Sequence, residues 1–559
     1  MTIPRAAVIA LVVVFALLTY PGAMVVSLAT RFAPAPQATA GPPGALPWLH
    51  VVHPRSGIPY MADDEGRMVI LHAATPPSLL EFGPGTSPAY PIDPAAYEDG
   101  RCPANVLSNR YPPLCMSDVE EMARLGFNAI RLPISWSVLE PERGQFTEQL
   151  LDRLAQIVDW ARAQRMYVIL DLHQNAYSHY VGASDSSVNL AFNSGAPRWA
   201  TFTDGLPSHV YLGQRELNPA VVEATTNFWY DRAGIQDEYL AALAFIARRF
   251  KNDPVVVGYG VYNEPFLGWN LPPGFEDLLL FPFYRRAIDA ITGVHDGLPC
   301  WSGFFLPAAC GFRDLGVDDT RHLFFLDAGL LREVTDFPTH LPMPVTSYPN
   351  VVLALHAYTH FYTVDKLLPQ LVSSDAYPWG GYDQSYSLAE HEARSMGAAL
   401  FVSEFGNAPA DDSRLLAAQV VEQELHRTGF AFWAWKENGA GGWGVYAPSA
   451  SPDSSSDCLR AGREQLLARV YPRATADPAA TWSYDSATGA FRFDAKGGSG
   501  DPQTLIYAPP EVTGAVSVDG AATDVVATNA DGSRTITLTP AGGAFRVRVA
   551  AAPLALSGC

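Results

Sequence analysis

The run VVVGYGVYNEPF, residues 255–266, is rich in Val and Tyr and closes with Asn-Glu-Pro-Phe. β-Branched and aromatic residues dominate it, so it is predicted to be a buried strand. A carboxylate at the end of such a strand, here Glu264, is costly to bury unless it is paired, hydrogen-bonded or kept protonated for a task. Glu264 is therefore the first candidate for a functional residue.

Similar apolar runs recur along the chain and alternate with amphipathic helical stretches. The predicted strands cover 67–73, 128–134, 166–173, 255–264, 350–358, 399–406 and 429–437, with a further strand near 299–307. Helices are expected between them, for example over 116–126, opened by a Ser cap and closed by Gly126, and over 146–165. Strands that are apolar on both faces and alternate with helices form a covered parallel sheet. Eight such units, without a glycine-rich first turn, predict an α/β protein with a (β/α)8 (TIM) barrel.

The helical period disappears near residue 480. Residues 481–550 contain only short alternating runs separated by Gly, Asp and Asn, which predicts a small C-terminal antiparallel β-sandwich. We expect this part to cap and stabilise the barrel rather than to act as an independent carbohydrate-binding module. The predicted domains are accordingly a catalytic barrel over 48–475 and a β-sandwich over 480–550.

The N-terminus carries a targeting pattern. Residues 1–29 combine Arg5, an apolar stretch and a small-x-small cleavage site, the three parts of a secretory signal peptide. The apolar segment 6–29 is also long enough to span a bilayer, and it would act as a signal anchor if it stays uncut. A Pro/Ala-rich linker follows over 30–47. The protein is therefore predicted to be secreted or otherwise extracytoplasmic.

Charge and cysteine content exclude several classes of partner. The net charge of −20 disfavours nucleic acid and anionic membranes. Six cysteines in an exported chain indicate disulfides rather than metal or thiol chemistry. The close pairs are Cys102 with Cys115 and Cys300 with Cys310, which leaves Cys458 and Cys559. No Cys-x-x-Cys or His-rich spacing supports a zinc site, and we predict neither metal nor cofactor.

Polar and aromatic residues gather where the predicted strands end, which is where the catalytic side chains of a barrel belong. They are Arg131, Asp171, His173, Asn263, Glu264, His356, Tyr358, Glu404, Trp433, Trp435 and Lys436. Glu264 and Glu404 end the fourth and seventh barrel strands, which face each other across a closed barrel. Glycoside cleavage needs such a pair, one carboxyl protonated to release the leaving oxygen and one ionised to attack the anomeric carbon.

Mutual repulsion between two close carboxyls raises the pKa of one of them. We therefore expect Glu264 to stay protonated until the leaving oxygen takes its proton. The alternative for both glutamates is a structural ion pair with Arg131 or with a histidine.

Five motifs resemble those of retaining β-glycosidases of glycoside hydrolase family 5. They are RLPISWSVLEPERGQF (131–146), LDLHQN (170–175), VYNEPF (261–266), LHAYTHFY (355–362) and VSEFG (402–406). Within that family, ADDEGRMVIL, SGAPRWATFTDGLP and YPRA, with a trailing β-sandwich, look like the endoglycoceramidase branch, which cleaves an intact glycan from the ceramide of a glycosphingolipid. The resemblance spans the barrel and implies a monomer that acts on a glycolipid without a cofactor.

The resemblance also implies a role for each matching residue. Glu264 would be the general acid/base and Glu404 the nucleophile. The substrate-binding residues would be Arg131 and Tyr358 beside Glu404, Asn263 at the sugar 2-hydroxyl, His173, Asn175 and His356 along the sugar subsite, and Trp433 or Trp435 as its stacking floor.

Two positions depart from the branch pattern. Asn175 stands where an Asp is usual, and the loop 72–85 lacks the Lys expected beside that Asp. The loss of both members of a charged pair leaves neither stranded, so the pocket is expected to be retuned rather than broken. A galactosylceramide-type lipid or a steryl glycoside then becomes a candidate beside a glucosyl lipid.

Two apolar stretches are candidates for the lipid side, 266–283 and 439–448. They would form an acyl groove, make transient contact with a membrane surface, or belong to the helical core, and the sequence leaves these alternatives open. Rival functions are a steryl-β-glucosidase, a β-glucan endoglucanase and a catalytically silent glycolipid receptor. The paired glutamates speak against the receptor, which needs no acid and nucleophile.

Overall fold

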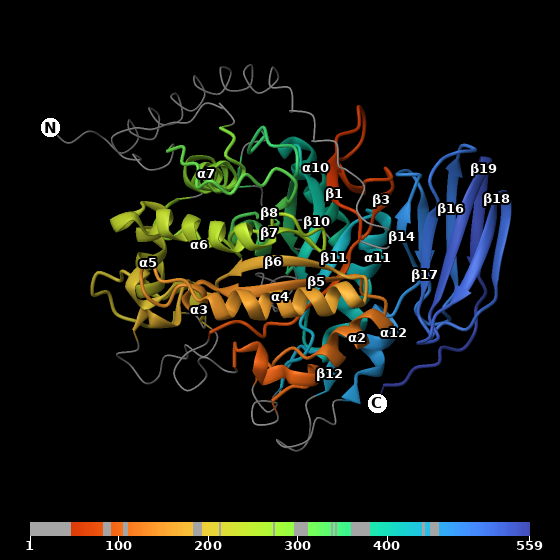
Figure 1. Ribbon diagram of the computed structural model, residues 1–559, viewed down its shortest axis with the longest axis horizontal. Coiled ribbons are helices and arrows are strands. Elements are labelled where there is room, and N and C mark those ends of the chain that lie inside the picture. Colours follow the sequence, from red (N-terminus) through yellow and green to blue (C-terminus); the bar gives the residue numbers. More distant parts are fainter. Residues whose placement is uncertain are drawn as a thin grey trace.

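The computed structural model describes residues 46–81, 91–103, 110–182, 193–211, 214–271, 274–295, 311–336, 339–340, 344–358, 381–438, 442–447 and 458–558. Within these ranges, eight parallel strands close into a barrel surrounded by helices, and an antiparallel sheet lies beside it (Figure 1). The predicted barrel with a C-terminal antiparallel module is confirmed.

The barrel strands follow one another around the circle in chain order. They are β4 (His72–Thr75), β5 (Ala129–Ser135), β6 (Tyr167–His173), β7 (Val256–Gly260), β8 (Leu323–Asp327), β9 (Val351–His356), β10 (Ala399–Phe405) and β11 (Gly429–Trp433). Alternate residues such as Ala129, Ile169 and Phe325 fill the interior, and the residues between them pack against the helices. This alternation aims the last inward residue of each strand into the mouth of the barrel.

The helices cover the outside of the barrel and pack on the apolar outer faces of the strands. They include α2 (Met116–Arg124), α3 (Trp136–Leu139), α4 (Glu148–Ala163), α5 (Pro219–Trp229), α6 (Ile235–Phe250), α7 (Phe281–Thr292), α8 (Leu330–Thr335), α10 (Tyr382–Met396), α11 (Ala417–Leu425) and α12 (Ala461–Leu467). The prediction of a Ser cap on α2 was wrong. Cys115 is its N-cap residue, and the Asp118 carboxylate accepts the Cys115 backbone N–H at 2.9 Å.

Two predicted strands differ from those in the structure. The run 67–73 divides, because β3 (Met68–Val69) pairs antiparallel with β14 (Tyr471–Thr475) and only β4 enters the barrel. The strand predicted near 299–307 lies outside the described residues. The fifth barrel strand is β8, which was not predicted, because its apolar run LFFL (323–326) is only four residues long.

The antiparallel sheet has nine strands and draws on both ends of the described chain. Besides β3 and β14 it contains β1 (Leu49–Val52), β2 (Tyr60–Asp63), β15 (Thr481–Tyr484), β16 (Phe491–Gly497), β17 (Thr504–Ala508), β18 (Val516–Thr528) and β19 (Arg534–Val549). Strand β19 joins two runs that were expected to be separate. At the start of β4 the His72 ring stacks on Tyr471 at 3.7 Å, so the sheet packs onto the barrel end opposite the mouth.

The structure contains a disulfide between Cys102 and Cys115, with a Cα–Cα distance of 5.3 Å. Cys458, left over in the sequence analysis, is also disulfide-bonded. Cys300, Cys310, Cys559, the signal segment 1–29 and most of the linker lie outside the described residues. No helix within the described part of the chain is both long and apolar enough to cross a membrane.

Candidate active site

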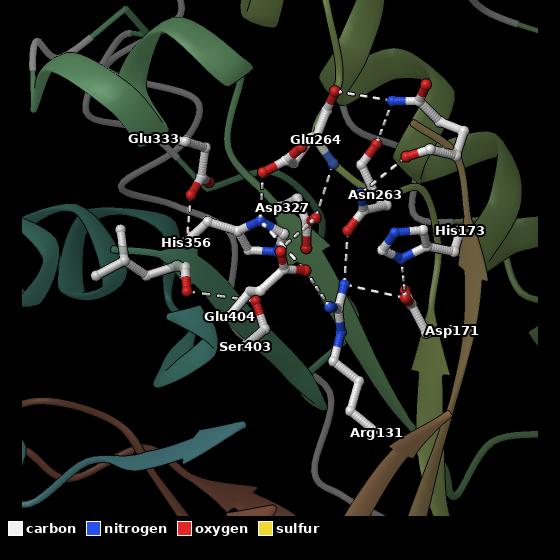
Figure 2. A network of polar contacts seen from close by, with 12 residues as sticks. Arg131, Asp171, His173, Asn263, Glu264, Asp327, Glu333, His356, Ser403 and Glu404 are labelled. Carbon is white, nitrogen blue, oxygen red and sulfur yellow. Dashed lines mark hydrogen bonds and ion pairs between the residues drawn. The ribbon is translucent and has the colours of Figure 1, made fainter. Parts of the chain in front are cut away.

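The polar side chains at the carboxyl ends of the strands converge at the mouth of the barrel (Figure 2). Arg131 on β5 and Asp171 on β6 point inward, two residues beyond Ala129 and Ile169. Gly260, at the end of β7, makes room for this pair, because a Cβ atom there would collide with the Asp171 carboxylate. Gly260 on β7 thus leaves space for the Asp171 carboxylate on the neighbouring strand β6.

Glu404 reaches the mouth through an irregularity in β10. Phe401 faces the interior, so strict alternation would turn Ser403 inward as well. The pairing register between β10 and β9 shifts between Val402 and Glu404, and Glu404 then pairs with His356. Such a bulge re-aims the side chains that follow it. The carboxylate of Glu404 therefore enters the site in place of the Ser403 hydroxyl.

Two donors hold the Glu404 carboxylate. Arg131 Nη1 lies 2.6 Å from Oε2, and the Tyr358 hydroxyl donates to Oε1 at 2.7 Å. Arg131 also forms an ion pair with Asp171 at 3.0 Å. Burial lowers the pKa of Arg131, but the Asp171 and Glu404 carboxylates outweigh burial and raise it. Arg131 is therefore a fixed positive charge beside the Glu404 carboxylate.

Glu264 stands just beyond β7 in a left-handed backbone conformation, with φ of 41°. Asp327 Oδ2 accepts its backbone N–H at 3.0 Å, and Gln174 Nε2 donates to its carbonyl oxygen at 3.0 Å. A non-glycine residue adopts this conformation only where its surroundings enforce it, and such residues gather at functional sites.

The His356 imidazole is fully buried among carboxylates. Its Nδ1 lies 3.0 Å from Glu264 Oε1 and 3.9 Å from Glu404 Oε2, and its Nε2 lies 3.2 Å from Asp327 Oδ2. Burial lowers the pKa of His356, but the charges of Asp327 and Glu404 outweigh burial and raise it well above the ordinary value. His356 is therefore an imidazolium at neutral pH.

The expected rise in the pKa of Glu264 was wrong. Burial raises the pKa of Glu264, but the hydrogen bond and positive charge of His356 outweigh burial, so the net pKa is lowered. The positive charge of His356, between the two glutamates, offsets the repulsion from Glu404 on which the expectation rested. The proton available to Glu264 therefore rests on His356 Nδ1.

The two glutamates are close enough to act on one sugar carbon. One carboxylate oxygen of Glu264, one of Glu404 and a ring nitrogen of His356 lie within 4.8 Å of one another. Retaining glycosidases separate their carboxyls by about 5–5.5 Å, whereas inverting enzymes need about 6.5–9.5 Å to admit a water molecule. The spacing therefore suits direct attack by a carboxylate rather than attack by water.

Further predicted residues border these carboxylates. Asn263 Oδ1 accepts from Arg131 Nη2 at 2.7 Å, and Asn263 Nδ2 donates to the Gln174 carbonyl at 2.9 Å. The His173 ring stacks on Trp433 with 5.5 Å between centroids, and Asp171 binds its Nδ1 at 2.9 Å. The buried His173 Nε2 has no hydrogen-bond partner among the described residues, so it is a candidate to bind a sugar hydroxyl.

Trp435 lies away from the other predicted site residues. It is 1% exposed, its Nε1 donates to Asp118 at 3.0 Å, and its ring meets Phe127 and Tyr446 edge-on in the core outside the barrel strands. Lys436 pairs with the same Asp118 at 2.7 Å. We therefore assign no substrate contact to Trp435, and the stacking floor falls to Trp433.

The two positions that depart from the family pattern are Asn175 and the loop after β4, and this loop contains the carboxylate of Glu81. Asn175 forms an isolated backbone bridge with Ser194. In the loop after β4, Glu81 accepts from the Tyr180 hydroxyl at 3.0 Å, and its backbone N–H donates to Ser135 at the end of β5. Glu81 was not predicted, because a lysine is the residue that the family pattern places in this loop.

Asp327 was also missed, although it contacts both Glu264 and His356. Its signal is visible in retrospect, because LFFLD (323–327) repeats the pattern of a short apolar strand that ends on a polar residue. The strand itself was not recognised, so its final residue was not considered.

Glu264, His356 and Glu404 also meet the distance criterion for a metal site. The chemistry of these donors fits a cation poorly, because a metal ligand must be a neutral imidazole and both nitrogens of His356 face carboxylates as donors. Arg131 adds a second positive charge beside Glu404.

The stretch 266–283 divides between core and surface. Phe275 and most of the apolar residues after it are buried, so the helical part belongs to the core. The preceding loop is different, because Trp269 is 57% and Leu271 82% exposed. Trp269 Nε1 donates to Glu223 at 2.7 Å, which fixes the ring at the surface. In the second stretch, Tyr446 packs on Trp435.

Comparisons with known proteins agree with this geometry. A family model described as Cellulase (glycosyl hydrolase family 5) matches residues 108–295. Endoglycoceramidase I of Rhodococcus hoagii (strain 103S) is 24% identical over 442 residues, which are 76% of this chain and 78% of that protein. A crystal structure of endogalactoceramidase is 26% identical, with a TM-score of 0.70 over 90% of this chain and 100% of that one. Endo-glycoceramidase II from Rhodococcus sp., in a ganglioside GM3 complex, has a TM-score of 0.66 at 24% identity over 88% and 99% of the two chains.

Proposed function

We propose that this chain, which is a glycoside hydrolase of family 5, is an exported retaining β-glycosidase that cleaves the bond between a glycan and its lipid. The observation that carries the proposal is the separation of Glu264 and Glu404, whose nearest oxygens lie within 4.8 Å. The relatives with ceramide-linked substrates in their names support the choice of substrate.

Glycosylation is the first half of the proposed reaction. Glu404, held in place by hydrogen bonds from Arg131 and Tyr358, attacks the anomeric carbon, while Glu264 gives a proton to the glycosidic oxygen. The bond from the anomeric carbon to that oxygen breaks, a bond to Glu404 forms, and the lipid leaves as an alcohol. In the second half Glu264 takes a proton from water, whose oxygen displaces Glu404.

The remaining roles concern the sugar. Asn263 is oriented by Arg131 and Gln174 to meet the 2-hydroxyl. His173 offers Nε2 to a hydroxyl, and Trp433, stacked on His173, forms the floor. Asn175 stands where an Asp is usual, and the loop after β4 carries Glu81 and no Lys, so we expect a sugar other than glucose to be accepted next to the lipid.

The lipid side of the substrate is proposed to leave past the exposed loop at Trp269 and Leu271, which starts two residues beyond Glu264. An aromatic ring and a leucine of this exposure suit brief contact with a lipid surface. The net charge of −20 restricts that contact to surfaces without strong negative charge.

Mass spectrometry of products tests the proposal. The purified protein is incubated in mild detergent with glucosyl- and galactosyl-linked glycosphingolipids, a steryl glucoside and a β-glucan, beside the Glu404→Gln variant as control. Released glycan together with free ceramide, absent with the variant, is the expected result. Turnover of only the steryl glucoside or the glucan would overturn the substrate class, and binding without turnover would favour a receptor.

A further inference from the structure

Asp327 contacts the two groups that handle the proton in the proposed reaction. It ends β8 and is buried, and a single oxygen, Oδ2, accepts the Glu264 backbone N–H at 3.0 Å and lies 3.2 Å from His356 Nε2 (Figure 2). No role in the reaction has so far been given to it. Asp327 therefore contacts both the backbone of Glu264 and the ring of His356.

The first contact bears on the conformation of Glu264. A left-handed backbone costs a non-glycine residue of order 1–3 kcal/mol unless its surroundings hold it. The Asp327 carboxylate receives the Glu264 N–H, and the Leu330 N–H, three residues beyond Asp327, donates to the Pro265 carbonyl at 2.9 Å. The segment that begins at Asp327 therefore holds the chain on both sides of the Glu264 carbonyl.

The second contact decides where His356 carries its protons. A neutral imidazole has a single N–H, whereas the charged ring has two. With the Asp327 carboxylate at Nε2, an N–H stays on that side, and the second proton lies on Nδ1, 3.0 Å from Glu264 Oε1. Asp327 thereby directs the mobile proton of His356 toward Glu264.

Other charged groups surround the His356 ring from each neighbouring element. They are Glu264 after β7, Asp327 on β8, Glu333 on α8, Glu404 on β10, and, one contact further, Arg131 on β5 and Asp171 with His173 on β6. Glu333 contacts the His356 backbone N–H rather than the ring. Burial raises the pKa of Glu333 well above its ordinary value, which favours its uncharged form.

We propose that Asp327 is a positioning residue for the acid/base Glu264: one carboxylate oxygen fixes the Glu264 backbone and holds the proton-bearing His356 against the Glu264 carboxylate. The inference rests on the proposed role of Glu264. When substrate binds, the proton moves from His356 Nδ1 to Glu264 Oε1, which leaves a neutral ring with its N–H on Asp327. Glu264 then passes the proton to the leaving oxygen, and the proton taken from water in the second half-reaction returns to His356.

Asp327→Asn separates the charge of Asp327 from its shape. The Asn carbonyl oxygen can still accept the Glu264 backbone N–H and lie against His356 Nε2, but the negative charge is gone. In the form active in acid catalysis, one mobile proton is shared between His356 Nδ1 and Glu264. Removal of the negative charge of Asp327 lowers the affinity of this pair for that proton. The basic limb of kcat/KM is therefore expected to move to lower pH, by about one unit or more.

The leaving group gives a second, independent readout. General acid catalysis contributes about 10²–10⁴-fold, and a good leaving group needs little of it. Asp327→Asn is expected to lower kcat/KM on a lipid-linked glycoside by at least about tenfold, and on a dinitrophenyl glycoside by at most about threefold. Equal losses on both substrates, or an unmoved basic limb, would show that Asp327 only supports the fold.

Three variants complete the experiment. Glu333→Gln matches the protonated form of Glu333 and is expected to leave the basic limb in place; a shift as large as that of Asp327→Asn would overturn the proposal. Asp327→Glu restores the charge, and its basic limb is expected to return toward that of the wild type; failure to return would contradict the charge effect. Glu264→Ala tests the proposed function separately from the role of Asp327. If its loss of kcat/KM is equal for the lipid-linked and the dinitrophenyl glycoside, Glu264 is not the general acid and the proposed function fails. If its loss is much larger for the lipid-linked glycoside, the proposed function stands and the other results test only the role of Asp327.

Discussion

Single residues decide what this barrel mouth can do, and their charges differ from what the sequence alone predicts. Glu264 and Glu404 were identified from their place at strand ends, because that inference needs only strand order and alternation. The charge of His356 could not be inferred in this way. It depends on carboxylates from β8 and β10 that meet the ring only in the folded chain.

The two glutamates are expected to fail in different ways when replaced. Glu404→Gln removes the attacking oxygen and should lower turnover by more than about a thousandfold on every substrate. Glu264→Ala should keep the first half-reaction with a dinitrophenyl glycoside and accumulate a glycosyl-enzyme, detectable by intact-protein mass spectrometry. Turnover of Glu404→Gln within tenfold of the wild type would exclude it as the nucleophile.

Trp433 and Trp435 can be compared directly by replacing each with Phe. We expect Trp433 to contact the sugar and Trp435 to serve only in packing. Trp435→Phe loses the hydrogen bond to Asp118, which should cost about 1–3 kcal/mol of unfolding free energy with little change in kcat/KM. Trp433→Phe should mainly raise KM. Calorimetry and kinetics on both variants check this assignment, and a Trp435→Phe variant that is inactive but fully stable would refute it.

At the scale of elements, strands with long apolar runs were predictable and short ones were not. Strands β7, β8 and β11 have five residues each, but β7 and β11 lie in the longer apolar runs VVVGYGVY (255–262) and GFAFWAW (429–435). The run of β8 is only LFFL (323–326), and this strand was not predicted. The register shift in β10 was also invisible in the sequence. It arises from pairing with β9, and a local pattern of apolar residues does not encode it.

The loop at Trp269 and Leu271 should matter only when the substrate lies in a membrane. Leu271→Ser is expected to reduce hydrolysis of a glycolipid in phosphatidylcholine vesicles several-fold and to leave a soluble aryl glycoside unaffected. Leu425→Ser is the control, because Leu425 is 64% exposed on α11, a helix that packs beside the antiparallel sheet. Equal effects of the two variants on vesicles would argue against contact through this loop.

At the scale of the whole molecule, one apolar cluster joins the antiparallel sheet to the segment that leads into the barrel. Met68 and Ile70, which precede the first barrel strand, pack in one cluster with Tyr471, Phe493 and Ile536. The sequence indicated the sheet by its alternating runs. It did not indicate that β1 to β3 join it, because those strands lie about 400 residues earlier in the chain.

Deletion of residues 480–558 should therefore expose this cluster and prevent the barrel from folding stably. We expect loss of soluble protein or a large fall in Tm, measured by circular dichroism on whatever fraction is soluble. A deletion variant that unfolds cooperatively at the Tm of the full chain would instead identify the sheet as an independent module.

The central claim is that Glu404 attacks the sugar directly, which fixes the stereochemistry of the product. Proton NMR of the first sugar released from a β-linked substrate, recorded before mutarotation, tests this claim. Two displacements at one carbon predict the β-anomer, in keeping with carboxylate oxygens within 4.8 Å of each other. An initial α-anomer would mean a single displacement by water and would contradict the assignment of Glu404 as nucleophile.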